Sequence, residues 1–282
     1  MNSKRLLIIL LYFFLTEVLS FGCSTSYDLT QPAQKIIERF PNIDKAITVE
    51  LLKGSLYETP AFIFDSGEPG EVVLIIGGTH GNEPAGYEAA LRQLELLEKS
   101  PPQKGKVIII PLANRQSVIN YDRRIQVPEG EDIERGNLNR CYPGDENGLP
   151  MEKMAFEIEE LSKEHKVTIF IDQHEAKYFH LNTPKESNRD QGLGQTIIYY
   201  PNETSSWIVM NMIDEINSSI SDSDEQFSSV EMPIPHSAAW WAGKHLDIAA
   251  FTFETMREME LDKRINFHLS LVRSVLELNN MW

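Results

Sequence analysis

The chain has 282 residues, 41% of them hydrophobic and 24% charged, so a substantial core is possible and the composition argues against wholesale disorder. This length suits one α/β domain, or at most two small ones. The formal net charge of −16 argues against broad contact with nucleic acid or anionic lipid, and we expect no nucleic-acid partner.

The N-terminus has the pattern of a secretory signal. Two basic residues, at positions 4 and 5, precede an apolar run over residues 6–15, which is too short to span a membrane as a helix. Two endings of the signal remain open. Residues 18–20 (VLS) fit ordinary cleavage, whereas residues 19–23 (LSFGC) resemble a bacterial lipobox in which Cys23 carries lipid.

This pattern divides the chain into three predicted segments. They are a signal peptide over 1–22, a tether over 23–45 and a single folded domain over 46–282. We expect an exported protein, in the periplasm or on the outer cell surface, whose one contact with a membrane would be a lipid anchor at Cys23. The only cysteines are Cys23 and Cys141, which do not make a disulfide framework.

Apolar strands alternate with amphipathic helices along the rest of the chain. The pattern predicts a short helix near 33–40, a hairpin over 49–67, strands at 71–78, 105–114, 167–172, 195–201 and 247–255, and helices at 84–100, 152–166, 205–220 and 263–278. Residues 120–150 and 218–229 are predicted to be loops. The alternation predicts an α/β fold, with a largely parallel sheet covered by helices on both faces.

Two of the predicted strands run into metal-ligand side chains. His80 and Glu83 follow the strand in LIIGGTHGNEPAG, and His174 follows the strand in FIDQHEA. In open α/β sheets, ligands bind beyond the carboxyl ends of the strands. Imidazole and carboxylate are good zinc ligands, and three protein ligands leave one position open, as in catalytic zinc sites. Asp172 is placed to orient a ligand from behind.

Two further stretches carry residues suited to hydrolysis. Glu254 ends the apolar strand AFTFET, where a buried strand gains nothing from a carboxylate but a zinc site gains a general base. In the charged loop, RGNLNRCYPG places an amide and a guanidinium side by side at Asn139 and Arg140, and such a pair can bind a carboxylate.

Taken in this order, the four motifs resemble the zinc carboxypeptidase superfamily. GGTHGNEPAG, NLNRCYPG, DQHEA and AFTFET most resemble its succinylglutamate desuccinylase/aspartoacylase branch, over roughly residues 70–260. The resemblance implies a mixed, largely parallel sheet sandwiched between helices. It also implies one zinc ion per chain, a zinc-activated water and a glutamate general base.

The resemblance also implies a role for each matching residue. His80, Glu83 and His174 would bind zinc, and Glu254 would be the general base. Asn139 and Arg140 would bind the substrate carboxylate. An upstream arginine polarises the scissile carbonyl. The order of the family's motifs favours Arg124 for this role, with Arg123 and Arg135 as alternatives.

Three departures from the family pattern bear on function. Asn137 replaces the usual aspartate of the Asp-Leu-Asn-Arg motif, which is expected to loosen the local orientation of the loop. One predicted helix follows Glu254, where aspartoacylases carry a β-rich domain that narrows the pocket. Relatives that handle free acylated amino acids are usually cytoplasmic, whereas this chain has an export pattern. The last two departures favour an open site and an extracytoplasmic substrate, such as a peptide.

The leading hypothesis is therefore a zinc metallohydrolase that cleaves an amide bond next to a substrate carboxylate. It would act as a carboxypeptidase on a small peptide, or as a deacylase on an N-acyl amino acid. The alternative is an exported pseudoenzyme that binds a carboxylate without catalysis. Bound zinc in the purified protein distinguishes the two.

Overall fold

The computed structural model describes residues 40–181 and 192–282, which belong to one compact unit spanning Ala33–Trp282. The predicted signal segment, the first part of the tether and most of the short helix near 33–40 lie outside the described residues. None of the helices in the described part of the chain is long and apolar enough to cross a membrane.

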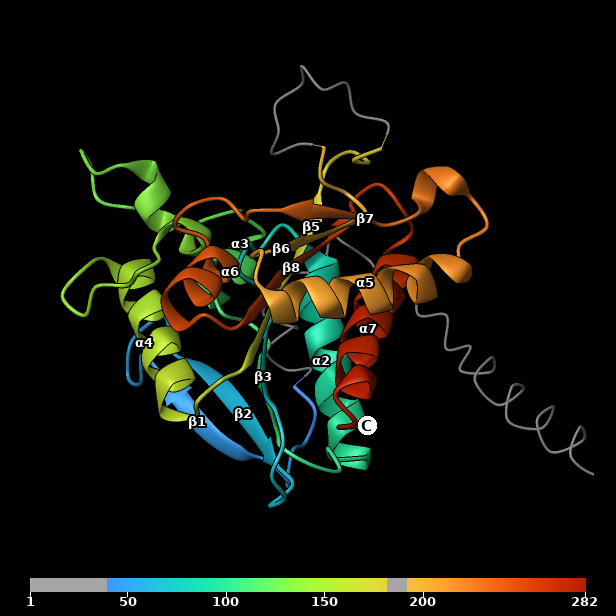
Figure 1. Ribbon diagram of the computed structural model, residues 1–282. Coiled ribbons are helices and arrows are strands. Elements are labelled where there is room, and N and C mark those ends of the chain that lie inside the picture. The colour runs from blue at the N-terminus through green and yellow to red at the C-terminus, as the bar shows by residue number, and fades with distance from the viewer. Residues whose placement is uncertain (1–39, 182–191) are drawn as a thin grey trace, which may run out of the picture. The chain divides into compact units, whose positions relative to one another are not determined.

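The described domain is built on one eight-stranded mixed sheet (Figure 1). Its strands are β1 (Ile47–Leu51), β2 (Thr59–Asp65), β3 (Val72–Ile76), β4 (Lys106–Ile110), β5 (Ile169–Ala176), β6 (Thr196–Tyr199), β7 (Ser228–Glu231) and β8 (Ala249–Met256). Their spatial order is β1-β2-β4-β3-β5-β8-β6-β7. Strands β4, β3, β5 and β8 are consecutive and parallel, so their carboxyl ends meet at one edge.

Helices cover both faces of the sheet because the central strands are apolar on both sides. The helices are α2 (Pro84–Lys99), α3 (Arg115–Asn120), α4 (Pro150–Glu164), α5 (Glu203–Ser218), α6 (Ala238–Trp241) and α7 (Leu261–Leu278). On β3, Val73 and Ile75 pack with α2, α5 and α7, whereas Leu74 and Ile76 pack with α4 and α6. Alternate residues of a strand point to opposite faces, which produces these two cores. The α/β fold with a mixed, mostly parallel sheet is thus confirmed.

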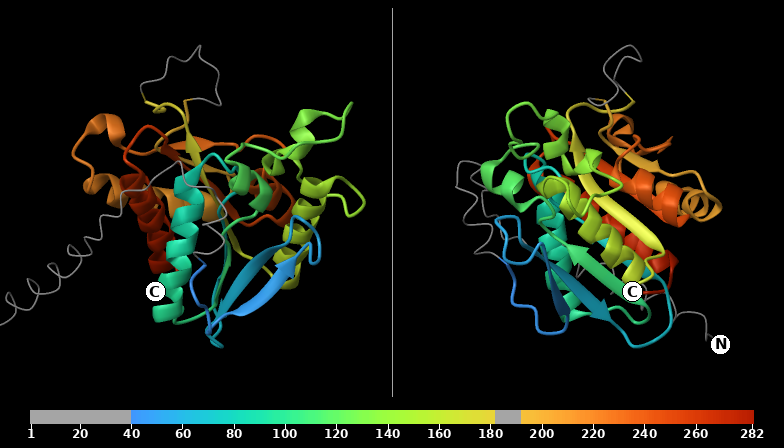
Figure 2. Two further views of the ribbon diagram at one scale, coloured as in Figure 1. Left: turned by 180° about the vertical axis from the view of Figure 1, so that it is seen from behind. Right: turned by 90° about the vertical axis from the view of Figure 1, so that its left-hand side faces the viewer.

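The antiparallel hairpin β1–β2 extends the sheet at one edge, as the pattern over 49–67 predicts (Figure 2). Ahead of β1, Phe40 and Ile43 pack against the α2/α5/α7 core. The backbone N–H groups of Asp44 and Lys45 donate to the carboxylate of Glu98 on α2. The last residues of the predicted tether therefore lie against the domain.

Several elements differ from the sequence-based expectation. Strand β5 does not end at Asp172 but continues to Ala176, so that His174 lies within the strand. The polar segment predicted as a loop over 218–229 contains a 3₁₀ turn and the first residues of β7. Helices α3 and α6 were not predicted, since both are short and carry little hydrophobic periodicity. The predicted loop over 120–150 holds only two 3₁₀ turns, Ile133–Gly136 and Leu138–Arg140, before α4 begins.

Candidate metal centre and active site

The loop between β3 and α2 holds His80 and Glu83 at the carboxyl edge of the sheet. Gly81 is required in this loop, because a Cβ there would lie 1.9 Å from the backbone oxygen of Ser117. Glu83 is the N-cap residue of α2, which begins with Pro84 as a proline in the first turn favours. Both side chains are buried, so the turn directs them into the protein rather than toward solvent.

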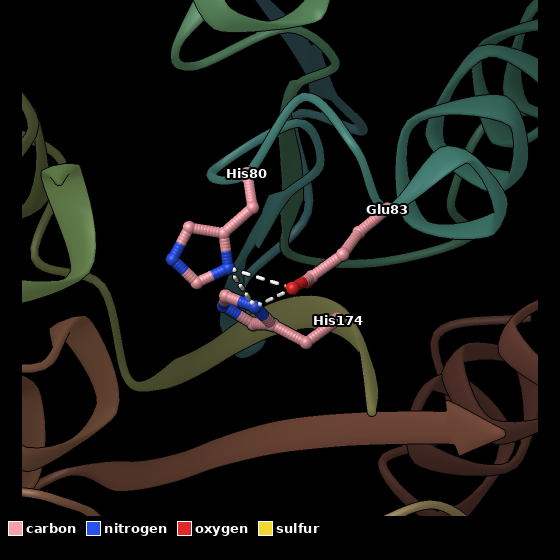
Figure 3. A group of neighbouring side chains, drawn as sticks. All are labelled: His80, Glu83 and His174. Atoms are coloured by element: carbon pink, nitrogen blue, oxygen red, sulfur yellow. Dashed lines mark hydrogen bonds and ion pairs between the residues drawn. The ribbon is translucent and has the colours of Figure 1, made fainter. Parts of the chain in front are cut away.

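His174 meets these two side chains from the neighbouring strand β5 (Figure 3). Nδ1 of His80 lies 3.0 Å from Oε1 of Glu83, and Nδ1 of His174 lies 2.9 Å from Oε2. The two Nδ1 atoms are 3.1 Å apart. Ligand atoms bound to one tetrahedral zinc at about 2.0–2.1 Å are separated by about 3.3 Å. Three buried donor atoms at nearly that spacing fit a single small cation.

The other ring nitrogen of each histidine is held by a side-chain oxygen. Nε2 of His80 donates to Oδ1 of Asn137 (2.9 Å), and Nε2 of His174 donates to Oδ2 of Asp172 (2.8 Å). Thr79 in turn donates its hydroxyl to Oδ1 of Asp172. Such acceptors place the ring hydrogen on Nε2 and leave Nδ1 free to bind a metal. The position expected for Asp172, behind a ligand, is the one that it occupies.

Asn137 has a fixed orientation, contrary to the loosening expected from its replacement of aspartate. Its Oδ1 also accepts the backbone N–H of Asn139 (3.1 Å), and its Nδ2 donates to Oε2 of Glu134 (2.7 Å). The same glutamate pairs with Arg124. The Asn137 amide therefore links His80 to the carboxylate of Glu134. This series of hydrogen bonds orders the loop.

Replacing Asn137 with leucine is expected to weaken zinc binding by about 10- to 100-fold, because partners of this kind orient metal-binding histidines. Competition with a chelator of known affinity measures the effect. The double variant Asn137→Asp/Glu134→Gln exchanges donor and acceptor between the two side chains and keeps an acceptor for His80, so it should retain most of the affinity. Unchanged zinc binding in a folded Asn137→Leu protein would refute the orienting role.

The charges of the three residues are strongly coupled. Burial lowers the pKa of His80 to about 4. Burial also disfavours a charge on His174, but the carboxylates of Asp172 and Glu83 outweigh it and raise the pKa of His174 well above its usual range. Burial likewise opposes the charge on Glu83, yet the two histidines hold its pKa well below the usual range. These shifts favour an ionised Glu83 beside the two imidazole rings.

Glu254 stands opposite His174 in the parallel pairing of β5 and β8. Because Asp172, His174, Thr252 and Glu254 occupy alternate positions in register, all four side chains point to the α4/α6 face. Oε2 of Glu254 is buried and has no hydrogen-bond partner among the described residues. Burial raises the pKa of Glu254 to about 8. A cation bound next to the carboxylate would lower that pKa and favour the ionised base.

The predicted arginines occupy different surroundings. Nη1 of Arg123 lies 3.0 Å from Oε1 of Glu83, whereas Arg124 pairs with Glu134 outside the donor set. Arg135 pairs with Glu131 and Glu152. The assignment of the carbonyl-polarising role to Arg124 stays a prediction, and Arg123 is the arginine of the three that contacts the site.

Arg257 is a site residue that sequence reasoning missed. It follows directly after β8, and its Nη2 lies 3.3 Å from Oε1 of Glu83 and 3.4 Å from the backbone oxygen of Glu175. A signal was available, since Arg257 comes three residues after Glu254 at the carboxyl end of a parallel strand. Two guanidinium groups, from Arg123 and Arg257, therefore approach the same carboxylate.

Asn139 and Arg140 belong to the second 3₁₀ turn of the loop, and Asn139 lies beside the donor set. Oδ1 of Asn139 accepts the backbone N–H of Ala238, and its Nδ2 lies 3.5 Å from Nε2 of His174. Both of these nitrogens carry hydrogen, so the contact is not a hydrogen bond and Nδ2 can donate to a ligand. Arg140 is half-buried and donates to the backbone oxygen of Asn139 (2.7 Å).

Glu175 belongs to the opposite face of the sheet, so it cannot replace Glu254 as a base. Its side chain is buried, pairs with Arg264 of α7 and accepts the backbone N–H of Ala85 at 2.9 Å. The carboxylate of Glu175 thus links β5 both to the first turn of α2 and to α7.

The change Glu175→Gln is expected to cost about 3–5 kcal/mol of unfolding free energy, because it leaves the buried guanidinium of Arg264 without its counter-charge. Urea denaturation measures the loss. The matched control is Glu277→Gln, which breaks the exposed pair with Arg273 and should leave the midpoint close to wild type. Equal midpoints for both variants would show that another group neutralises Arg264.

Cys141 and the tryptophan pair have structural surroundings. Burial raises the pKa of the Cys141 thiol to about 12, so the thiol stays protonated and packs in the α4/α6 core. Trp241 packs in the same core against Tyr142 and Phe170. Trp240 is half-buried between His236 and His245. Core packing thus describes Trp241.

Solved structures share this architecture over most of the chain. Product-bound cell shape determinant protein Csd4 from Helicobacter pylori is similar with a TM-score of 0.64 and 18% identity, over 84% of this chain and 56% of that one. A metallo-carboxypeptidase from Burkholderia cenocepacia gives a TM-score of 0.60 and 14% identity, over 87% and 66%. An aspartoacylase family protein from Mesorhizobium loti gives 0.58 and 20%, over 91% and 70%. The fold is therefore of the metallocarboxypeptidase type.

Sequence comparison identifies the branch. Residues 69–195 match the succinylglutamate desuccinylase/aspartoacylase catalytic domain. The chain is also 36% identical over 96 residues to N-alpha-acetyl-L-2,4-diaminobutyric acid deacetylase from Halomonas elongata, a match that covers 34% of this chain and 26% of that protein. Over residues 69–195 the chain is thus similar to the succinylglutamate desuccinylase/aspartoacylase family, and the sequence match spans about a quarter of the curated relative. Among the described residues, His80, Glu83 and His174 are the one group of three that can hold a metal ion.

Proposed function

We propose that this chain is a zinc-dependent amide hydrolase that acts next to a carboxylate of its substrate. One observation carries the proposal. A buried His-Glu-His donor set lies beside Glu254, whose buried Oε2 has no partner among the described residues. A donor set alone would suit a structural ion, but the additional carboxylate beside it supplies what hydrolysis needs.

His80, Glu83 and His174 would hold the zinc, which when bound supplies Lewis-acid chemistry and lowers the pKa of a coordinated water. Glu254 accepts a proton from the attacking water and returns it to the leaving nitrogen. Asn137 and Asp172 keep the two imidazole rings in place. Each of these steps uses a group that the sheet or its loops already hold in position.

The substrate carboxylate is assigned to Nδ2 of Asn139, which lies next to His174 and lines the same cavity as Glu254, and to the guanidinium of the adjacent Arg140. An arginine donates to the scissile carbonyl oxygen as negative charge develops on it. The order of the family motifs favours Arg124 for this role, and the contact with Glu83 favours Arg123. Both belong to the same loop.

Two substrates fit this assignment, a peptide cleaved at its C-terminal residue and an N-acyl amino acid. Csd4 from Helicobacter pylori, whose structure is similar to this chain, is a D,L-carboxypeptidase, and the curated relative is a deacetylase. Zinc-loaded protein should be tested on peptides with free and amidated C-termini and on N-acetyl amino acids. Cleavage that requires the free carboxylate supports the proposal, and indifference to amidation contradicts it. No hydrolysis by zinc-loaded protein favours the pseudoenzyme.

The start of the chain further supports a proposed export. A basic start followed by a short apolar run is typical of signals that are removed or lipidated. Mass spectrometry of the protein made in a bacterial host should find residues 1–20 or 1–22 missing, or lipid on Cys23. An intact Met1 on cytoplasmic protein would contradict export.

A further inference from the structure

A small cavity adjoins the site and is lined largely by apolar side chains. Its volume is about 40 Å³, with room for about three water molecules. Glu254 and Asn139 line it on the side of the donor set. The apolar lining consists of Leu193, Ile198, Val230, Met232, Pro233 and Ile234.

The floor of this cavity is a row of side chains across three strands. Ile198 of β6 pairs with Thr252 of β8 on one side and with Val230 of β7 on the other. Paired residues point to the same face, so the three side chains form one surface beside Glu254. The segment after β7, with Met232 at its start, forms a wall.

The cavity and the proposed carboxylate grip share Asn139. In an amino acid, the carboxylate and the side chain are attached to the same Cα, so a carboxylate held at Asn139 brings the side chain next to the cavity. The amide bond to be cleaved must lie at Glu254, and its nitrogen is attached to the same Cα. The position of this bond therefore also brings the side chain next to the cavity. The side chain of the residue that carries the carboxylate is therefore the group that enters.

The lining of the cavity disfavours a charged substrate side chain. Among the residues that the structure describes, no cationic side chain lines the cavity, so an aspartate or glutamate side chain would lose hydration with only the hydroxyls of Ser237 and Thr252 as new partners and no counter-charge. Of the described lining residues, Glu254 alone could pair with a lysine side chain, and that contact would occupy the base. Resting on the proposed function, we infer that this site selects substrates whose carboxylate-bearing residue has an aliphatic side chain, such as valine or leucine.

The test uses the full zinc-loaded chain and two substrate series, N-acetyl amino acids and N-acetyl dipeptides, each ending in leucine, valine, aspartate or lysine. The leucine and valine members should be cleaved with kcat/KM about 10- to 100-fold above the aspartate and lysine members. Met232→Glu, at a half-exposed position, should reduce this preference at least tenfold and favour lysine. The matched control Met232→Leu should keep the preference for leucine and valine. The isosteric change Val230→Thr places a hydroxyl in the lining and should reduce that preference.

Direct binding separates this inference from the proposed function. Calorimetry with free leucine, aspartate and lysine tests the cavity without turnover. Hydrolysis that favours aspartate or lysine overturns the aliphatic preference and leaves the proposed function intact. Leucine binding that Met232→Glu weakens, without hydrolysis of either series, supports the cavity and overturns the proposed function. Equal binding of the three amino acids overturns the inference.

Discussion

Glu254→Gln is expected to lower the rate of hydrolysis by about 10²–10⁴-fold, the usual contribution of a positioned general base. This corresponds to roughly 3–5 kcal/mol of activation free energy at about 1.4 kcal/mol per tenfold. Glutamine has nearly the same shape but accepts no proton from water. Steady-state kinetics on the substrate found in the free-carboxylate test measures the change, while zinc content should stay near one ion per chain.

The matched control for this change is the other buried glutamate of the paired strands. Glu175→Gln, once folded, should keep its rate per bound zinc, because Glu175 lies on the α2/α7 face and pairs with Arg264. A near wild-type rate for Glu254→Gln would mean that the base lies elsewhere. Loss of zinc from Glu254→Gln would instead identify Glu254 as a ligand, and the assigned mechanism would have to be withdrawn.

His174→Ala is expected to abolish zinc binding and hydrolysis together. The substitution removes one of three donors and leaves Asp172 and Glu83 facing each other across a buried space without the imidazole between them. Elemental analysis after dialysis should find less than about one-tenth of an ion per chain, because a catalytic site has only three protein ligands to lose.

The control for nonspecific effects of removing a histidine is His165→Ala, at the C-cap of α4 and outside the donor set. It should keep zinc and activity. Full zinc content in a folded His174→Ala protein would show that the ion binds elsewhere. Thermal unfolding with and without zinc adds a second readout, since added zinc should stabilise the wild type and the His165 variant but not His174→Ala.

Much of the fold could be predicted because its central strands are buried on both faces. The segments around Val73 and Ile108 are uninterrupted apolar runs, and such runs are typical of parallel strands covered by helices. The polar end of β5 could not be predicted in this way. Its residues are buried on both faces among polar partners, so the local composition resembles a loop while the pairing with β8 continues to Ala176.

The donor set was accessible to sequence reasoning because its residues follow apolar runs typical of buried strands. Their supporting contacts were less accessible. Glu134 reaches His80 only through Asn137, and that relation depends on how a 3₁₀ turn folds against the sheet. Arg257 approaches Glu83 from a strand far along the sequence, and its side-chain direction is set by the turn after β8. Strand β7 was missed because half of its residues are exposed and polar.

The two-sided use of β5 limits how this protein can change. Asp172 and His174 serve the candidate site, while Gln173 and Glu175, one position away in each case, bind Gln93 of α2 and Arg264 of α7. Adding or deleting one residue in this strand would present a carboxylate or an amide to the site and an imidazole to the helices. Substitutions can therefore accumulate in β5 one at a time, but a change in its length would remove the site and destabilise the helix layer in one event.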